Sequence, residues 1–471
     1  MAGLQPIDVI GGFYADPDRA WSVQDTCNWD PVLAEQQGTR TPIKLGTPCG
    51  LTTSWTVGEG DPCRLLYVAE GAMFAIHGNT LRQFVAGSWV TRGAIPGAMR
   101  CTASHNGRES GMQVRFNNGQ FGGGYVWDNG AQTFTKITDP GYPGSVSDGY
   151  IDHYLTGVSP DGRFWFISNL DDAMDYNTLD RQQGEASPDR MIAAQPMQFE
   201  VVAFSQTTTE FFANTGSAQG TFQNKRAVID VGCAGRFTVQ SIDNTLIWLG
   251  NDGIVYRING YQKQRISTTA IEKAIAGLNW VDALSYTHVD RGRVYYFLHF
   301  PDGRTWRYDC ASQLWSRRES LGMDRWRVSH IVKWNGDFYA GSLFDGKIWK
   351  LDWDSVTEDG EPFVSYRRTQ VVANAGNPFR LEEVAAQVQV GAKPDNWPVG
   401  VDHELMFRYS KDGGYNWSNA KRRSMGLMGE YNTIVLYQNM GLFRKELVLE
   451  FSCSSPRKRD LHGATAKLSA A

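Results

Sequence analysis

Carboxylates and histidines at ligand spacing could hold a metal ion, and the sequence offers one acidic cluster of this kind. It consists of Asp171, Asp172, Asp175 and Asp180, and carboxylates suit a hard cation such as calcium. The spacing departs from the D-x-D-x-D-G pattern of calcium loops, so we favour a solvated loop. No H-x-x-x-H or H-E-x-x-H pair occurs, and we interpret each histidine as a core or surface residue. The eight histidines are His77, His105, His153, His288, His299, His330, His403 and His462.

A second motif combines Ser410, Asp412, Gly414 and Trp417 in the Ser-x-Asp-x-Gly-x-x-Trp pattern of an Asp box. In such a turn the Asp and Ser side chains hydrogen-bond to the backbone and hold a hairpin together. The pattern is known from sialidase-like propellers, where its role is structural. A sialidase also needs several boxes and an arginine cluster that grips a carboxylate, and we find one box. We therefore predict a structural turn.

Three short basic runs could contact DNA phosphates, although we favour solvated faces or contacts with acidic patches on partner subunits. They are Lys421-Arg422-Arg423, Arg444-Lys445 and Arg457-Lys458-Arg459. The run Gly122-Gly123-Gly124 lies within a strand pattern, unlike the strand-to-helix turn that holds a phosphate. No G-x-S-x-G motif, P-loop or combination of nucleophile, base and orienting residue is recognisable. We predict that the protein is not an enzyme and has no catalytic, cofactor-binding or metal-binding residues.

Length and composition predict a β-rich globular chain. Its 471 residues correspond to one to three domains, and its 50 Gly, 16 Trp and 19 Tyr suit many turns and aromatic strands. A formal net charge of −4 does not indicate nucleic-acid binding. Seven scattered cysteines without a C-x-x-C pair predict reduced, mostly packed thiols. Because neither a signal peptide nor an 18-residue apolar run is visible, we expect no membrane insertion and a reducing cytoplasm.

The segment 242–275 shows the local pattern most clearly. Leu246 to Leu249 and Ile254 to Ile258 read as two apolar strands, and the turn Asn251-Asp252-Gly253 lies between them. A polar strand at 262–266 follows. Thr269-x-x-Glu272 then predicts a capping box at the start of a short helix.

Turns followed by aromatic strands recur at a nearly constant interval. With turns at positions 71, 119, 162, 208, 253, 303 and 346, the steps are 48, 43, 46, 45, 50 and 43 residues. A step of about 45 residues is typical of one four-stranded propeller blade. A lone blade cannot cover both of its faces, so copies pack around an axis. The pattern predicts an all-β fold with a six- or seven-bladed β-propeller; an irregular pair of β-sandwiches is the alternative.

Three regions follow from these patterns. Residues 1–50, rich in Gly, Pro and Asp, predict an N-terminal arm that is extended or loosely packed. Residues 51–355 form the predicted propeller. Residues 356–471 contain longer strand patterns near 381–390, 405–409, 434–437 and 447–451, which predict a C-terminal β-sandwich-like domain. The tail from residue 454 contains basic residues, and the chain then finishes with small residues.

Ordered sequence blocks cover nearly the whole chain and resemble those of a known family. At the N-terminus they are IGGFYADPDRAWSVQDTCNWDP and LGTPCGL. In the middle they are SPDRMIA, TEFFANTG, IWLGNDGIVYRINGYQKQRISTTAIEKAI and DALSYTHVDRGRVYYFLHFPDGRTWRYDCASQLWSRRES. At the C-terminus they are RYSKDGGYNWS, the run from Met425 through GLFRKELVLEFS, and LHGA. The chain thus resembles the packaged DNA stabilisation proteins of short-tailed phages, also called tail accessory, hub or nozzle proteins. LGTPCGL departs from the expected Pro-Gly-Leu at Cys49.

The resemblance implies a virion structural protein without catalytic residues. Members of this family form ring subunits, typically hexameric, below the portal and its adaptor ring at the portal vertex. The ring extends and closes the DNA channel, stabilises packaged DNA and opens for genome ejection. The implied partners are further copies of the chain, the portal adaptor, a tail fibre or tailspike, and a tail needle or plug. Genomic double-stranded DNA would pass with transient, non-specific contact. The implied location is the virion tail, assembled in the host bacterial cytoplasm.

The alternative function is a glycan-binding or glycan-cleaving propeller, such as a sialidase-like protein or a depolymerase. The single Asp box, the aromatic residues and the blade spacing are its basis. A generic propeller scaffold that binds host proteins is a third alternative. The continuous family blocks argue against both.

Overall fold

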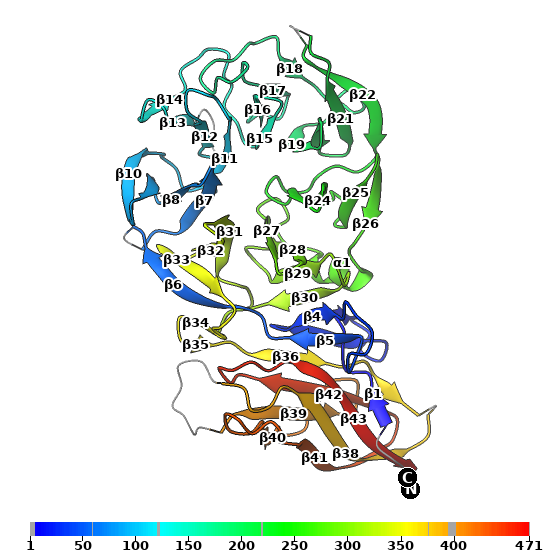
Figure 1. The fold of residues 1–471 in the computed structure, drawn as a ribbon. Coiled ribbons are helices and arrows are strands. Elements are labelled where there is room, and N and C mark those ends of the chain that lie inside the picture. Colours follow the sequence, from blue (N-terminus) through cyan, green and yellow to red (C-terminus); the bar gives the residue numbers. More distant parts are fainter. Residues whose placement is uncertain are drawn as a thin grey trace.

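The computed structural model describes residues 5–58, 60–119, 123–217, 220–374, 376–393 and 402–470. These residues form a ring of four-stranded sheets with a β-sandwich beside it (Figure 1). The described chain contains seven such sheets in the ring, so the predicted β-propeller with a C-terminal sandwich is confirmed, with seven blades. No helix within the described ranges is long and apolar enough to cross a membrane.

Each blade is a meander of four antiparallel strands, and the first strands of neighbouring blades contact one another around the ring. Blade one consists of β7 (Cys63–Ala69), β8 (Ala72–His77), β9 (Thr80–Val85) and β10 (Ser88–Ala94). Blade two consists of β11 (Thr102–His105), β12 (Gln113–Asn117), β13 (Gly124–Asp128) and β14 (Thr133–Lys136). Blade three consists of β15 (Asp148–Ile151), β16 (Tyr154–Val158), β17 (Trp165–Ile167) and β18 (Arg181–Gln182). Blade four consists of β19 (Met191–Met197), β20 (Glu200–Ser205), β21 (Thr209–Asn214) and β22 (Phe222–Ile229). Blade five consists of β23 (Gln240–Ile242), β24 (Thr245–Leu249), β25 (Val255–Asn259) and β26 (Gln262–Arg265). Blade six consists of β27 (Leu284–Asp290), β28 (Arg293–His299), β29 (Thr305–Asp309) and β30 (Trp315–Arg318).

Blade seven closes the ring with a strand from the opposite end of the chain. Its first three strands are β31 (Val328–Trp334), β32 (Asp337–Ser342) and β33 (Lys347–Asp352), and its fourth is β6 (Gly50–Thr56). Strands β33 and β6 are antiparallel, with Asp352 opposite Gly50. The short β34 (Thr357–Glu358) and β35 (Glu361–Pro362) extend the same sheet. The propeller is therefore held shut by backbone hydrogen bonds between its two ends.

Six of the seven predicted turns join the second and third strands of a blade. In three of these turns an aspartate side chain accepts the backbone N–H two residues further on: Asp161 accepts that of Arg163 at 3.2 Å, Asp252 that of Ile254 at 3.1 Å, and Asp345 that of Lys347 at 3.0 Å. Such Asx turns explain why Asp-Gly marks the blades. The first predicted turn, Glu70-Gly71, instead joins the first and second strands of blade one.

Each pair of neighbouring blades encloses its own apolar cluster, and the described chain has one cluster for every junction around the ring. Between blades three and four, for example, the ring centroids of Trp165 and Phe212 lie 5.3 Å apart in an edge-to-face contact. A buried aromatic pair of this kind adds about 0.5–1.5 kcal/mol beyond its area burial. The aromatic side chains of these strands therefore fill the space between neighbouring blades.

Within the described residues, one helix packs against this core. Helix α1 (Thr269–Ile275) follows blade five and buries Ile271 and Ile275. The predicted capping box is wrong by one residue, because Thr268 is the N-cap and its hydroxyl accepts the N–H of Ile271 at 3.4 Å. Glu272 instead pairs with Arg265 at 2.7 Å, a strand residue that precedes the helix.

The sandwich consists of two sheets to which the N-terminal segment contributes heavily. One sheet has the order β4 (Asp30–Leu33), β5 (Ile43–Gly46), β43 (Leu461–Ala470), β38 (Phe379–Val388) and β41 (Val435–Phe443), with β1 (Gln5–Ile7) also paired to β43. The other has the order β3 (Val23–Cys27), β36 (Ser365–Arg368), β42 (Glu446–Cys453), β39 (Glu404–Ser410) and β40 (Lys421–Ser424), with β2 (Tyr14–Ala15) on β3 and β37 (Val372–Ala373) on β42.

The loose packing predicted for the N-terminal arm is therefore wrong. Trp29 and Leu45 are fully buried in the sandwich core. Strand β3 also pairs in parallel with β30 of blade six, where Cys27 lies opposite Arg317. One continuous sheet thus runs from blade six into the sandwich, and the N-terminal segment is the strand that joins them (Figure 1).

The C-terminal tail is also more ordered than the sequence suggested. Strand β43 (Leu461–Ala470) lies inside its sheet, between β38 on one side and β5 and β1 on the other. Its buried face consists mostly of small residues, including Ala464 and Ala466. The pattern predicted no strand here because small side chains provide little hydrophobic periodicity.

Candidate functional site

The Asp box forms the turn after β39, in the sandwich and outside the propeller. Asp412 accepts the backbone N–H of Asn416 at 2.9 Å and the Ser410 hydroxyl at 2.7 Å. The Gly414 N–H donates to the Ser410 oxygen at 2.8 Å. Bonds from the Asn416 backbone and side chain, followed by that from Ser410, lower the pKa of Asp412 to about 2. These contacts are all internal to the turn, which confirms the predicted structural role.

The acidic cluster does not converge on one point. Among the described residues, no group of three or more His, Cys, Asp or Glu side chains could hold a metal ion. The four carboxylates accept separate hydrogen bonds: Asp171 from His153, Asp172 from the Met174 N–H, Asp175 from Asn169 and Asp180 from the Gly220 N–H. These bonds order loops of blade three, and the sequence interpretation as a loop is confirmed.

The basic runs differ in exposure: Arg422, Arg423, Arg444 and Lys445 are exposed, whereas two arginines of the last run lie inside the sandwich. Arg457 and Arg459 are fully buried, so a role as a solvated face or as a DNA contact is wrong for these two residues. Arg459 donates to the carbonyl of Ser455 at 2.6 Å and to that of Phe363 at 3.2 Å. Burial lowers the pKa of Arg459 to about 10. These side chains satisfy backbone carbonyls at the start of the sandwich, which a charge pattern alone does not reveal.

The third glycine of the run Gly122-Gly123-Gly124 starts β13, as a strand residue, while Gly122 lies outside the described residues. A Cβ on Gly124 would lie 2.4 Å from the Tyr142 ring. The glycine here makes room for an aromatic side chain from the next blade connection.

Histidines and cysteines lie mainly in the core. All seven cysteines are free thiols and six are buried, as predicted. Burial lowers the pKa of His77 and His288 to about 4 and that of His299 to about 3. These rings are therefore neutral at pH 7, and they serve as packed polar groups of the blades.

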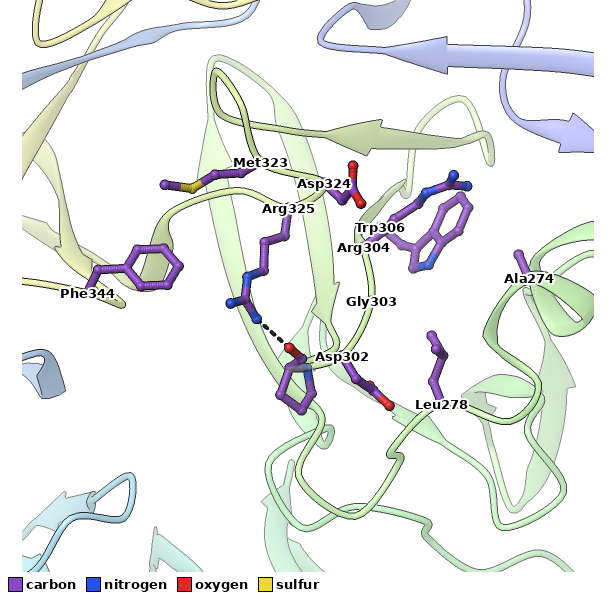
Figure 2. Close-up of a pocket in the computed structure, with 11 residues that line it drawn as sticks. Ala274, Leu278, Asp302, Gly303, Arg304, Trp306, Met323, Asp324, Arg325 and Phe344 are labelled. Carbon is purple, nitrogen blue, oxygen red and sulfur yellow. Dashed lines mark hydrogen bonds between the residues drawn. The ribbon is translucent and has the colours of Figure 1, made fainter.

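A pocket lies between blades six and seven, on the face that carries the turns between second and third strands. Its volume is about 580 Å³, and Figure 2 shows Arg325, Met323 and Phe344 on one side and Leu278 on the other. Arg325 donates to the Pro301 carbonyl at 2.5 Å. No Ser, Cys or His belongs to its described lining. The pocket can therefore accept a side chain or loop, but it offers no nucleophile.

A buried ion-pair network joins the propeller to the N-terminal segment. Asp30 and Arg307 form an ion pair in which both side chains are 3% exposed. Arg307 also donates to the Trp29 carbonyl at 2.7 Å, and the Tyr295 hydroxyl donates to Asp30 at 3.4 Å. Because blade six supplies Arg307 and Tyr295, this pair fixes the N-terminal segment against the propeller.

A second pair holds the sandwich side of the same junction. Arg317 of blade six contacts Asp25 of β3 at 2.5 Å, and the Tyr366 hydroxyl of β36 donates to Asp25 at 3.1 Å. Asn28 donates to the carbonyls of Glu319 and Val364 at 3.0 and 2.8 Å, which links blade six to the strand that begins the sandwich. The two domains are therefore joined by pairing, hydrogen bonds and buried charge.

Exposed apolar residues mark surfaces suited to protein contacts. The loop between β40 and β41 presents four of them: Leu427, Met428, Tyr431 and Ile434, which are 38%, 51%, 71% and 77% exposed. We call this group the sandwich loop patch. At the turn between β19 and β20 of blade four, Phe199 is 80% exposed. Isolated exposed apolar residues are ordinary, whereas four in one short loop concentrate exposed apolar surface at one place.

Comparisons with known proteins identify both parts of the chain. The family model described as "Bacteriophage P22 Gp10, beta-propeller" matches residues 6–356, and the model described as "Bacteriophage P22 Gp10, beta-sandwich" matches residues 365–469. Among curated proteins, no sequence matches the chain.

Solved structures that match the chain include the computationally designed Ika8 protein, with 11% identity, TM-score 0.41, and coverage of 64% of this chain and 99% of that one. The WD40 β-propeller domain of Doa1 has 12% identity, TM-score 0.42, and coverage of 65% and 98%. A chain of the mitotic checkpoint complex has 13% identity, TM-score 0.43, and coverage of 69% and 97%. Because the propeller model alone spans more than half of the sequence and the sandwich model follows it, the chain belongs to the bacteriophage P22 Gp10 family of phage structural proteins.

Proposed function

We propose that the chain is a subunit of the tail hub of a short-tailed phage, a homo-hexameric ring below the portal and its adaptor. The ring would extend and close the DNA channel and stabilise the packaged genome. The observation that carries this proposal is the ordered match of both domains to one family of phage structural proteins. We also propose that the role is mechanical and that the chain catalyses no reaction.

The junction between the domains suits a mechanical part. A pressurised channel requires subunits that transmit force without bending at a linker. Here β3 continues the blade-six sheet into the sandwich, and the Asp25–Arg317 and Asp30–Arg307 pairs lie inside the joint. A sheet that crosses the boundary leaves no flexible connection at that point. Each subunit would therefore move as one body when the hub opens for genome ejection.

The exposed surfaces provide places for partners. The sandwich loop patch is suited to a contact between hub subunits, because interface cores are enriched in Tyr and Met and depleted in charge. The propeller face with the blade six–seven pocket would receive a loop of the adaptor, fibre, tailspike or plug. Arg457 and Arg459 are buried, and the net charge is −4. These features suit a conduit that touches DNA only transiently, because phosphate contacts would retain it.

Electron microscopy of the purified protein mixed with portal–adaptor rings tests the proposal. A six-fold ring that caps the assembly is the expected result. A protein that stays monomeric and never attaches would contradict the tail-hub function. A panel of oligosaccharides, with release of reducing ends as the readout, tests the glycan-cleaving alternative in the same preparation, since saturable turnover would contradict a purely mechanical role.

Paired variants test the subunit contact. Tyr431→Ser combined with Ile434→Ser removes the two most exposed side chains of the sandwich loop patch. We expect loss of rings in electron micrographs while the circular dichroism spectrum and thermal unfolding stay unchanged. Phe199→Ser is the matched control, since Phe199 is equally exposed but lies on blade four. Loss of rings in the control alone would assign the contact to the propeller instead.

A further inference from the structure

Blade one ends in an uncovered outer strand. Strand β10 lies on the outer rim of the ring (Figure 1), and among the described residues only β9 pairs with it. Its register with β9 is regular from Ser88 to Thr91 and then shifts at Arg92, where a bulge interrupts the pairing. Residues 88–91 therefore form a short, regular strand edge whose outer side meets no other described strand.

The turn that precedes β10 determines which of its backbone groups point outward. The two central residues, 86 and 87, have φ angles of +49° and +88°, as in a type I′ turn. The hydrogen bond of the turn then joins Val85 and Ser88, which lie opposite each other. Because backbone groups alternate in direction along an antiparallel strand, the N–H and C=O groups of Trp89 and Thr91 point away from β9. An adjacent strand could form hydrogen bonds with these groups.

The outer strands of blades two to five are also uncovered among the described residues, but they are short or charged. Natural proteins commonly blunt sheet edges in these ways, which prevents pairing with another chain. Strand β18 has only two residues, and β14 has four and ends in a lysine. The remaining two strands carry basic side chains: Lys225 and Arg226 in β22, and Lys263 and Arg265 in β26.

Strand β10 lacks this protection. Its sequence is SWVTRGA, in which Arg92 is the only charged residue. The Arg92 guanidinium donates to Gln83 Oε1 at 2.9 Å and lies 4.4 Å from the centroid of the Trp127 ring of blade two, so it is held against neighbouring side chains. Val90 is 37% exposed. Residues 88–91 are thus an uncharged edge, of the kind that pairs readily with a strand of another chain.

One face of β10 is aromatic. The ring centroid of Trp89 lies 5.2 Å from that of Phe84 on β9 and 5.9 Å from that of Trp55 on blade seven. Trp334 of blade seven is 5.2 Å from Phe84. All four rings are only partly buried. Residues directly opposite each other on neighbouring strands share a face, so the residue of an added strand opposite Trp89 would lie beside these rings.

The chain itself covers two other outer strands with a further strand. Strand β3 pairs in parallel with β30 of blade six, where Cys27 lies opposite Arg317. Strand β34 pairs in parallel with β6 of blade seven, where Glu358 lies opposite Leu51. The blades of this propeller therefore accept a fifth strand at the position that is uncovered in blade one.

We propose that the outer edge of β10 binds an extended, uncharged segment of another protein, which adds to blade one as a fifth strand. The backbone groups of Trp89 and Thr91 form the hydrogen bonds, and the aromatic face selects an apolar residue opposite Trp89. In strand addition of this kind, backbone pairing supplies affinity and the side-chain contacts supply specificity. This surface does not depend on the tail-hub assignment.

Fluorescence anisotropy of a labelled peptide, titrated with the full chain, tests the site. The probe is a capped peptide of alternating threonine and valine with one central tryptophan. Its control carries N-methyl groups on alternate amides, which remove the backbone donors along one edge. We expect saturable binding of the probe with a Kd below about 1 mM, and binding of the methylated peptide that is weaker by about tenfold or more. No binding of the probe up to that concentration, or equal binding of both peptides, would overturn the proposal.

Two variants show whether β10 is the site. Thr91→Pro removes an outward N–H, and proline is tolerated on edge strands. Val90→Lys gives β10 a charge like those of β22 and β26 and leaves every backbone group in place. Each should weaken binding of the probe about tenfold or more while the circular dichroism spectrum stays unchanged. Lys263→Pro, on the charged outer strand β26, is the matched control and should bind the probe as the natural protein does. Unchanged binding in both β10 variants would overturn the proposal.

Sedimentation velocity of the full chain without peptide tests a second copy of the chain as the occupant. We expect the same oligomeric state for the natural protein, Thr91→Pro and Val90→Lys. An oligomer that dissociates in both variants would show that a second copy covers β10, and it would overturn the assignment of this edge to another protein.

Discussion

The Asp30–Arg307 pair provides a direct test of how the N-terminal segment is fixed to the propeller. Both side chains are 3% exposed, so neither is screened by water. Asp30→Asn leaves Arg307 charged in the core, with only the Trp29 carbonyl and the Ser316 hydroxyl as partners. Breaking a buried ion pair by removing one partner destabilises a protein by about 3–5 kcal/mol.

The reciprocal variant Arg307→Gln should also destabilise, since it leaves the Asp30 carboxylate with only Arg293 at 3.9 Å and the Tyr295 hydroxyl at 3.4 Å, and it removes the bond to the Trp29 carbonyl. The double variant leaves two neutral amides and no uncompensated charge. We therefore expect the double variant to be more stable than the sum of the single effects predicts, with a coupling energy of at least about 2 kcal/mol. Equilibrium urea unfolding, followed by tryptophan fluorescence, measures all three free energies of unfolding.

The matched control is the pair of Lys263 and Asp230, which also lies within ion-pair distance, at 2.9 Å, but whose aspartate side chain is 90% exposed. Lys263→Gln should leave the free energy of unfolding unchanged within error, because an exposed pair contributes little. Additive single effects at Asp30 and Arg307, or an equal loss in the Lys263 control, would refute the view that buried charge holds the junction.

Three further predictions concern the core, the sandwich and the ring. The free energy of unfolding should fall as the pH decreases from about 6.5 to about 4, by up to about 1.4 kcal/mol per pH unit for each buried histidine, because only the unfolded chain takes up these protons. Urea unfolding at several pH values in this range measures the fall. The variant His299→Gln should reduce the slope of the free energy of unfolding against pH. Asp412→Ala should destabilise the sandwich by about 1 kcal/mol through loss of the turn hydrogen bonds, and a midpoint of urea unfolding equal to that of the natural protein would contradict this. Leu51→Asp places a charge at a fully buried position of β6 and should open blade seven. Limited proteolysis should then show new cleavage sites in residues 328–352. The same substitution at the exposed Leu179 is the control and should produce no new sites.

The sequence was informative where structure depends on local chemistry. Asp-Gly turns such as Asp161-Gly162 combine an Asx turn with a residue that tolerates positive φ, so they mark blades whatever lies around them. The Asp box was predictable for the same reason. Aromatic strands behind each turn indicated the packed layers between blades. The family resemblance gave the order of the two domains.

Long-range pairing was not predictable in this way. Strand β43 is central to its sheet, yet its Ala464 and Ala466 carry no hydrophobic periodicity. Arg459 looks like a surface cation, and only the fold shows that it reaches carbonyls near residue 363, far back along the chain.

The closing strand of blade seven also sets an order on the folding of the molecule. Strand β6 ends at residue 56 and its partner β33 begins at residue 347, so a ribosome must synthesise nearly 300 residues between them. Residues 23–27 also pair with β36 and residues 43–46 with β43, and both of these partner strands are synthesised even later. During that time these strands have unpaired edges, which can pair with another nascent chain. Chaperone protection of the first 56 residues would therefore favour correct folding, and mixed pairing of this segment between chains is the misfolded product to look for.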